Sequence, residues 1–138
     1  MKNFSTTIEI QAPSDRVFAV LCDVERWPDW TSTMKSVRRI DAGPLAVGSR
    51  AQVQQPKLIP AVWQVTELDH RSFAWITRSP GVQITARHEV EENGSGSRAT
   101  LSLEFTGLIG PLLARLYRSL NERYLATEAR GLKARCEV

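Results

Sequence analysis

The sequence predicts an α+β fold in which a curved antiparallel sheet of about seven strands wraps round a long C-terminal helix, with two short helices after the first strand. Three observations lead to this prediction. Six strand-like stretches follow one another between residues 36 and 106, the links between them are short and rich in turn-forming residues, and residues 108–135 carry a helical pattern. Short links join antiparallel neighbours, and the last helix is the element long enough to cover such a sheet.

The first part of the chain predicts one strand and two short helices. From Phe4 to Gln11, apolar and polar residues alternate, as in a half-buried strand. Pro13 stands at the start of a predicted helix over residues 13–22, where its missing N–H falls among the unpaired donors of the first turn. The segment that follows holds a proline between Trp27 and Trp30, which predicts a separate helical turn or loop. We expect the two tryptophans to anchor this segment against the sheet.

The middle of the chain consists of predicted strands. They cover residues 36–40, 49–55, 61–68, 72–78, 82–91 and 97–106. The link Asn93–Gly96 is the strongest hairpin signal, because asparagine and glycine tolerate positive φ. Since neighbouring residues of a strand point to opposite faces, the more apolar sets are expected to face inward. These inward sets are Ala51, Val53 and Gln55; Trp63 and Val65; Phe73, Trp75 and Thr77; Val82, Ile84, Ala86, His88 and Val90; and Ala99, Leu101, Leu103 and Phe105.

Residues 108–135 predict one long helix. At 100° per residue its buried stripe comprises Ile109, Leu112, Leu113, Leu116, Leu120, Tyr124, Thr127, Gly131 and Ala134. Bulky aliphatic residues fill the first half of this stripe, whereas small residues dominate its end. Small residues either leave a cavity or bring a helix close to a sheet, and the residues alone do not choose between the two.

Length and composition restrict the class of protein. The chain has 138 residues, 42% of them hydrophobic and 24% charged, which predicts a single globular domain over residues 1–138 and argues against disorder. A net charge of +3 is too small to indicate a nucleic-acid partner. The longest apolar run falls short of the roughly 18 residues that a spanning helix needs, and the N-terminus lacks the apolar stretch of a signal peptide. We therefore expect neither membrane insertion nor secretion.

Side chains suited to metals or cofactors are sparse. Cys22 and Cys136 stand far apart and belong to no metal-ligand cluster, so we expect no disulfide, no zinc site and a reducing, cytoplasmic location. The sequence has no nucleophile elbow, phosphate-binding glycine loop or HExxH zinc motif. We therefore expect no metal and no cofactor.

Several segments together resemble one known family. Seven segments of the chain resemble the successive motifs of the polyketide cyclase/dehydrase branch of the START-like (SRPBCC) superfamily. They are Ile10–Phe18, Asp23–Trp30, Gly43–Ser49, Trp63–Asp69, Phe73–Trp75, Gly94–Thr100 and Gly131–Arg135. Each motif is weak alone, but their order and spacing together make the resemblance specific. Together the motifs span nearly the whole chain. The resemblance implies a helix-grip fold that encloses a cavity for a hydrophobic small molecule, and it favours the cavity interpretation of Thr127, Gly131 and Ala134. It fixes no activity, because the family holds lipid and hormone carriers, polyketide cyclases and chaperone cofactors.

The first hypothesis of function is binding of a hydrophobic or amphipathic small molecule between the sheet and the last helix. In this hypothesis Trp63 and Trp75 stack on a planar ligand. Arg123 either reaches an acidic or carbonyl group of the ligand or turns its charge to solvent. The expected ligand-binding residues are Val53, Gln55, Trp63, Trp75, Thr77, Ile84, His88, Phe105, Leu120, Arg123, Tyr124 and Thr127.

The alternative hypothesis is a cyclase/dehydratase-type enzyme. His88 would transfer a proton, because imidazole titrates near neutral pH, and Arg123 or Tyr124 would polarise a substrate carbonyl. Against this role, His88 has no carboxylate on its own strand face, and a neutral hydrogen-bonded histidine is the plainer interpretation. A protein-partner module would instead show a large exposed apolar patch, of which the sequence gives no sign.

Overall fold

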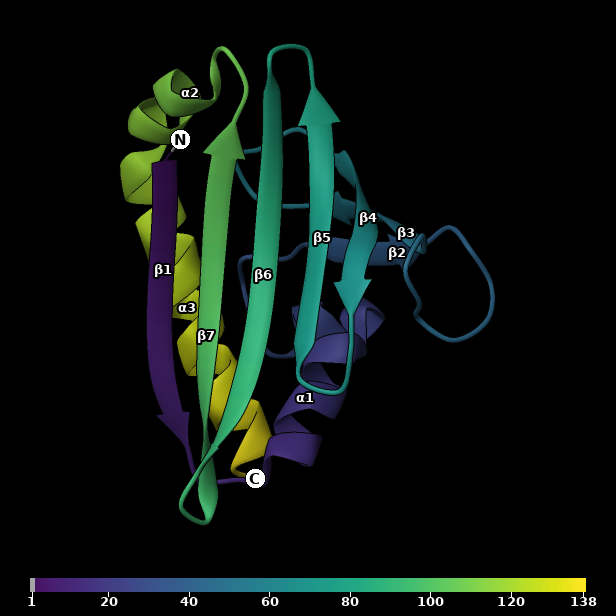
Figure 1. The fold of residues 1–138 in the computed structure, drawn as a ribbon, viewed down its shortest axis with the longest axis vertical. Coiled ribbons are helices and arrows are strands. Elements are labelled where there is room, and N and C mark those ends of the chain that lie inside the picture. The colour runs from purple at the N-terminus through teal and green to yellow at the C-terminus, as the bar shows by residue number, and fades with distance from the viewer. Residues whose placement is uncertain (1) are drawn as a thin grey trace.

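The computed structural model describes residues 2–138 and shows an α+β architecture with one seven-stranded antiparallel sheet, in the order β1-β7-β6-β5-β4-β3-β2 (Figure 1). The strands are β1 (Lys2–Ile10), β2 (Ser36–Arg39), β3 (Arg50–Gln54), β4 (Ala61–Leu68), β5 (Ser72–Ser79), β6 (Val82–Asn93) and β7 (Gly96–Thr106). The helices are α1 (Ser14–Cys22), the 3-10 helix η1 (Val24–Asp29), α2 (Gly110–Leu116) and α3 (Arg118–Cys136). The predicted fold class is confirmed, with its seven antiparallel strands and two short helices after the first strand. Within this part of the chain, no helix has both the length and the apolar content needed to cross a membrane.

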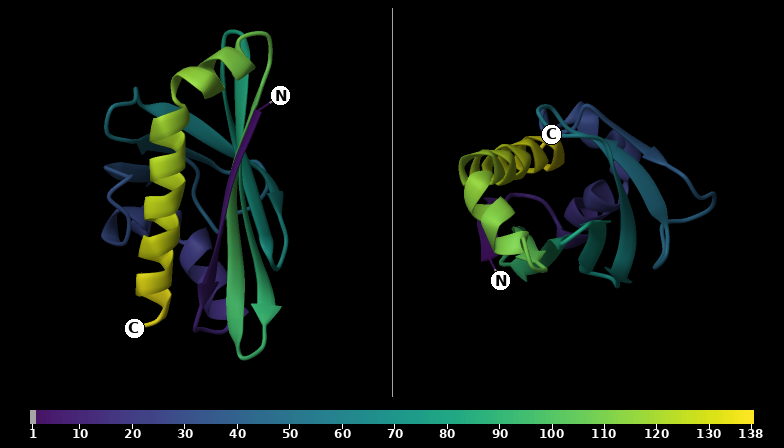
Figure 2. Two further views of the ribbon diagram at one scale, coloured as in Figure 1. Left: turned by 90° about the vertical axis from the view of Figure 1, so that its left-hand side faces the viewer. Right: turned by 90° about the horizontal axis from the view of Figure 1, so that it is seen from above.

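The sheet curves, and α3 lies on its concave side (Figure 2). The register of β4 and β5 shifts between Val65 and Glu67, and such a bulge bends a strand. One part of the core lies among α1, α3 and the strands β1, β6 and β7, and it includes Val17, Leu101 and Leu132. A second part joins η1 to strands β2 to β6. Between these two parts the inner face of the sheet remains open to the cavity described below.

The prediction of one helix over residues 108–135 is wrong, because the chain breaks at Tyr117. Its φ of −101° and ψ of +18° lie outside the helical values, and α2 and α3 run in different directions on either side of it (Figure 2). The break changes the rotational phase of the second helix. The residues that α3 buries are Asn121, Leu125, Ala129, Leu132 and Cys136. This stripe is displaced by one to two residues, about 130° round the helix, from the predicted Leu120, Tyr124, Thr127 and Gly131.

The same break exposes residues that were predicted to be buried. Ile109, Leu112, Leu116 and Ala134 all lie at the surface, so their assignment to the buried stripe is wrong. The face that α2 buries consists of Gly110 and Ala114 instead. Of the aliphatic residues expected in this stripe before the break, Leu113 packs partly against the core.

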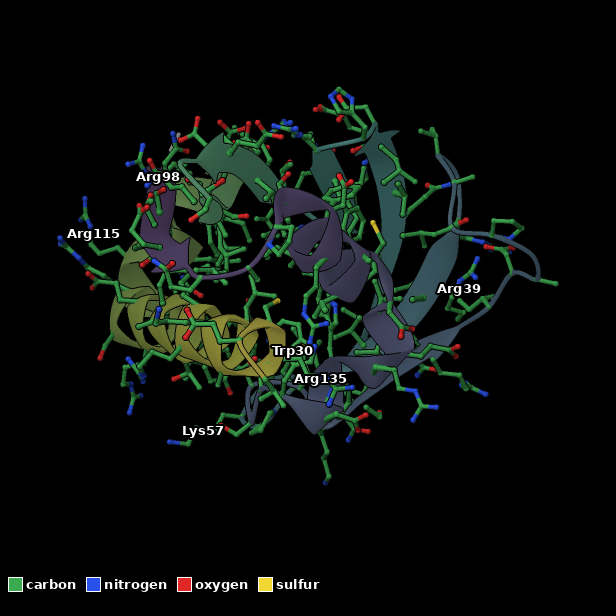
Figure 3. All side chains as sticks on the ribbon, turned by 90° about the horizontal axis from the view of Figure 1, so that it is seen from below. Trp30, Arg39, Lys57, Arg98, Arg115 and Arg135 are labelled. Atoms are coloured by element: carbon green, nitrogen blue, oxygen red, sulfur yellow. The ribbon has the colours of Figure 1, made fainter. Side chains whose placement is uncertain are left out.

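Gly131 allows α3 to approach the segment that follows η1. A Cβ atom at this position would overlap the carbonyl oxygen of Trp30 and would lie 3.1 Å from its carbonyl carbon. Figure 3 shows Trp30 beside the C-terminal part of α3, close to Arg135. The guanidinium group of Arg135 lies 3.9 Å from the carboxylate of Asp29. The missing side chain of Gly131 therefore serves close packing. The interpretation of Gly131 as a cavity-forming residue is wrong.

Candidate functional site

A cavity of about 490 Å³ lies between the inner face of the sheet and α3. Its walls come from η1, from strands β3 to β7 and from α3, so residues far apart in the sequence meet there. The strand alternation puts Ile84, Ala86 and His88 on this inner face, as predicted. The lining is mainly apolar and includes Trp63, Trp75, Ile84, Leu103, Phe105 and Leu125.

Five aromatic rings cluster at one end of the site, where four of them line the cavity and the fully buried Phe73 packs against Trp75 and His88. The ring centroids of Trp63 and Trp75 lie 5.8 Å apart, and Trp27 lies 5.2 Å from Trp75. Phe73 stacks on His88 at 4.8 Å with an interplanar angle of 22°. The indole N–H of Trp27 donates to a backbone carbonyl of α1 at 3.0 Å, which fixes the orientation of this ring. Trp27 thus anchors η1, as expected, and also lines the cavity.

Nine of the twelve residues expected to bind the ligand line this cavity: Val53, Gln55, Trp63, Trp75, Thr77, Ile84, His88, Phe105 and Tyr124. Leu120, Arg123 and Thr127 do not line it. The shifted phase of α3 explains all three, since Arg123 is exposed and Thr127 accepts a hydrogen bond from Arg130 on the helix surface (3.4 Å). The eight expected residues other than Tyr124 that line the cavity lie on strands or, like Gln55, directly after one. Their positions do not depend on the phase of α3.

His88 is buried and neutral. Because a carbonyl oxygen only accepts, Nδ1–H donates to the Phe73 carbonyl at 3.0 Å, and Nε2 is left with a free lone pair. Burial lowers the pKa of His88 to about 4, although the hydrogen bond to Phe73 acts in the opposite direction. At neutral pH the ring therefore offers the cavity a hydrogen-bond acceptor.

Glu128 lies on the cavity wall and was missed by the sequence-based prediction. Its Oε1 accepts a hydrogen bond from the Thr33 hydroxyl at 3.0 Å, and within residues 2–138 it forms no ion pair. Removal from water raises the pKa of Glu128 to about 7, against the lowering effect of the Thr33 bond. The carboxyl therefore gains and loses a proton near neutral pH. One signal in the sequence could have identified Glu128, namely its spacing of one helical turn from the predicted cavity residue Tyr124.

Asn121 is a second polar residue that the prediction missed. It lines the cavity from α3 and is only 8% exposed. Its Nδ2 has no hydrogen-bond partner in the part of the chain that the structure describes, and a buried donor left without a partner is costly. Seven residues separate it from Glu128, which corresponds to about 10 Å along the helix. Asn121, Glu128 and His88 thus supply separate polar positions in an otherwise apolar wall.

The two cysteines are not paired with each other. Burial raises the pKa of both Cys22 and Cys136 to about 11, so each is a protonated thiol at neutral pH and a poor metal ligand. Across residues 2–138, no three His, Cys, Asp or Glu side chains gather in a way that could hold a metal ion.

The cavity opens beside the loop between β3 and β4. Ile59 lines the cavity and is nevertheless 83% exposed, which places an opening at this loop. The loop turns at Lys57, whose φ of +68° lies in the left-handed region, and its side chain extends from the surface (Figure 3). The Tyr124 hydroxyl donates to the carbonyl oxygen of Pro56 and so joins α3 to this loop.

Replacing Tyr124 by phenylalanine is expected to loosen the loop without removing the ring from the cavity wall. Loss of one hydrogen bond of about 1 kcal/mol corresponds to an increase of about fivefold in the exchange rate of the backbone amide hydrogens in the loop. Hydrogen–deuterium exchange of residues 57–59 measures this change. Tyr117→Phe, at an exposed ring, is the matched control. Unchanged exchange in Tyr124→Phe would show that the bond does not hold the loop.

Comparisons with known proteins agree with this geometry. A family profile described as "Polyketide cyclase / dehydrase and lipid transport" matches residues 1–137 of the chain. No curated protein sequence matches the chain. These comparisons support the family resemblance seen in the sequence.

Solved structures share the fold at low sequence identity. The aromatase/cyclase ZhuI from Streptomyces sp. R1128 has a TM-score of 0.80 at 16% identity, with 99% of this chain and 93% of that chain covered. A hypothetical protein, jhp0584, from Helicobacter pylori has a TM-score of 0.82 at 15% identity, with coverage of 98% and 88%. Major latex-like protein 151 from Panax ginseng has a TM-score of 0.76 at 15% identity, with coverage of 98% and 97%. At these identities the likeness shows the fold alone, and it confirms the helix-grip prediction.

Proposed function

The chain belongs to the polyketide cyclase / dehydrase and lipid transport family, and from that premise we propose that it binds a hydrophobic or amphipathic small molecule between the sheet and α3. The observation that carries the proposal is the cavity itself. Its volume of about 490 Å³ falls within the roughly 300–1,000 Å³ of small-molecule sites. Its walls are largely apolar, and a core packed at ordinary density would leave no such space.

The lining favours a ligand with a flat apolar body and at least one polar group. Trp63 and Trp75 offer ring faces on which a planar ligand can stack. The neutral His88 accepts a hydrogen bond, whereas the unpartnered Nδ2 of Asn121 donates one. A carbonyl or hydroxyl group on the ligand would satisfy these atoms. The free thiols of Cys22 and Cys136 are consistent with the cytoplasmic location expected from the sequence.

Catalysis of the cyclase/dehydratase type is the second candidate function. His88 is a weak base here, because its pKa of about 4 leaves it neutral and its Nδ1 is already occupied by a backbone carbonyl. The observation that favours catalysis is Glu128, whose pKa of about 7 suits proton transfer near neutral pH. In this candidate function Glu128, not His88, would exchange the proton.

Filling the cavity is expected to abolish ligand binding. Ala86 lies on the inner face of β6 against Trp75 and Leu103, so Ala86→Phe places a ring in the cavity. We expect the dissociation constant for the fluorescent amphiphile 1-anilinonaphthalene-8-sulfonate to rise at least tenfold, measured by titration. The matched control is Thr85→Phe, which adds the same ring to the opposite face of β6 and should bind within a factor of two of the unchanged protein.

The two variants separate binding in the cavity from binding elsewhere. Near-ultraviolet circular dichroism checks that each variant keeps its packed core, since loosely folded states also bind this probe. Equal affinity of Ala86→Phe and Thr85→Phe would contradict the proposal. Such a result would place the probe on the outer surface.

A further inference from the structure

The segment around α2 exposes a row of large apolar side chains. Leu108, Leu112 and Leu116 are 98%, 63% and 71% exposed, and Ile109 and Tyr117 beside them are each 40% exposed. Leu112 and Leu116 lie four positions apart on one face of α2, and Leu108 lies in the turn just before this helix. We call the surface formed by Leu108, Ile109, Leu112, Leu116 and Tyr117 the α2 patch.

The amphipathic pattern of α2 is inverted. The helix turns Gly110 and Ala114 toward the core, where Ala114 packs against Val82 and Phe105, and it turns its leucines to solvent. A Cβ atom at Gly110 would lie 3.2 Å from the backbone of Phe105, so the small residues let α2 lie close to the sheet. The exposed leucines are therefore not required by the packing of this helix. Contiguous exposed apolar surface of this kind indicates a binding surface.

Positive charge predominates around the α2 patch, with Glu122 as the acidic neighbour of Arg118. Arg115 and Arg118 lie at its side, and no acidic residue occurs between Glu104 and Glu122. Arg118 faces Glu122 at 3.6 Å across the helix surface, whereas Arg115 forms no ion pair within residues 2–138. The two arginines also line a surface hollow of about 390 Å³ between β1 and the helices. Apolar side chains flanked by arginine fit the interface of an anionic bilayer, where leucines enter the acyl boundary and guanidinium groups meet the headgroups.

A second copy of the chain fits the same surface poorly. In a two-fold dimer the same surface faces itself, so the Arg115 side chains of both copies, which form no ion pair within residues 2–138, would be brought toward each other. The net charge of +3 adds to this repulsion. The charge pattern therefore favours an anionic membrane over self-association.

The α2 patch adjoins one end of the cavity. The backbone N–H of Ile109 donates to the carbonyl oxygen of Gly81 at 2.9 Å, in the turn between β5 and β6. Arg78 and Ser79, just before this turn, line the cavity, as does Phe105 just before α2. Figures 1 and 2 show α2 and the β5–β6 turn at the same end of the molecule.

We propose that the α2 patch docks the protein on the surface of anionic lipid bilayers. The leucines of α2 enter the interface, and Arg115 and Arg118 contact the anionic headgroups. Docking presents one end of the cavity to the lipid. Transfer of a ligand between bilayer and cavity would rest on the proposed function, whereas docking itself does not.

The test is co-sedimentation of the ligand-free protein with vesicles of phosphatidylcholine alone or mixed with phosphatidylglycerol. We expect tighter binding to the anionic vesicles, weakened by added salt, and a loss of at least tenfold in Leu112→Glu. Val47→Glu is the matched control, because Val47 is also 63% exposed but lies in the β2–β3 loop, and both variants have the same net charge. The control should bind like the unchanged protein.

Three outcomes would overturn docking. The first is equally weak binding of the unchanged protein to both kinds of vesicle. The second is a loss of affinity in Val47→Glu as large as that in Leu112→Glu. The third is a dimer of the unchanged protein, seen by sedimentation velocity without vesicles, that Leu112→Glu converts to a monomer. This result would assign the α2 patch to self-association. Failure of cavity binding in the Ala86→Phe experiment leaves all of these measurements unaffected.

Discussion

Replacing Gly131 by alanine is expected to lower the free energy of unfolding by about 3 kcal/mol, the upper part of the range for overpacking a closely packed site. The new methyl group would overlap the backbone carbonyl of Trp30, and a backbone atom cannot turn aside as the end of a flexible side chain can. Alanine normally stabilises a helix relative to glycine by about 1 kcal/mol, so the sign of the change is itself informative. For a domain of this size the melting temperature should fall by about 10 °C.

The matched control adds a larger group on the same helix where there is space. Ala134 is exposed, and Ala134→Leu keeps a good helix former, so we expect a change within about 0.5 kcal/mol. Urea unfolding followed by tryptophan fluorescence measures both variants. A Gly131→Ala protein as stable as the parent would mean that α3 and the Trp30 segment separate at little cost.

The strands and their faces could be predicted because their pattern is local. In β7 every second residue from Ala99 to Phe105 is apolar, and in β6 the same alternation from Val82 to Val90 is interrupted by His88 alone. A shift of one residue would turn the whole apolar set to solvent. The inward positions of Ala86, His88, Leu101 and Phe105 therefore followed from spacing alone. The cavity residues on strands were found for the same reason.

The helices were predicted less well because their phase depends on contacts distant in sequence. The leucines from Leu108 to Leu120 continue a helical pattern through Tyr117, and nothing local marks the break there. It is tertiary contact of Gly110 and Ala114 with β7 and of α3 with the sheet that sets two phases. A phase set by the leucines leaves Asn121 and Glu128 outside the predicted stripe. It also assigns Ile109, Leu112 and Leu116 of the α2 patch to the core.

The role of the small residues on α3 was undecidable from composition. Gly131 packs against Trp30, a contact made across about 100 positions of sequence, whereas Thr127 lies on the helix surface. The cavity instead arises from the curvature of the sheet and the distance at which α3 crosses it. Neither quantity can be derived from one chain's local pattern.

Glu128 and His88 are expected to give the stability of the protein two opposing dependences on pH. The pKa of Glu128 rises from 4.5 to about 7 on folding, so between these values the unfolded chain is ionised while the folded protein stays protonated. Stability therefore falls as pH rises through this window, by 1.36 kcal/mol per unit and at most about 3 kcal/mol. The pKa of His88 falls from 6.5 to about 4, so stability also falls as pH decreases through that window.

Glu128→Gln should remove the first dependence and leave the second. The glutamine keeps an oxygen that accepts from Thr33, so the hydrogen bond survives. At pH 8 the variant should be more stable than the parent by up to about 3 kcal/mol. This figure is a maximum, because the carboxyl is partly accessible from the cavity and is therefore partly solvated when ionised. At pH 4.5 most of this advantage should vanish, since the carboxyl is then protonated in the folded protein of the parent.

Urea unfolding at both pH values measures this difference, and comparing variant with parent cancels the titration of every other group. Glu122→Gln, on the exposed side of the same helix, is the control and should stay within about 0.5 kcal/mol of the parent. An advantage of Glu128→Gln that is equal at the two pH values would mean that the pKa of the carboxyl is the same in the folded and the unfolded protein. Glu128 would then be an ordinary solvated acid, and the second candidate function would lose the residue on which it depends.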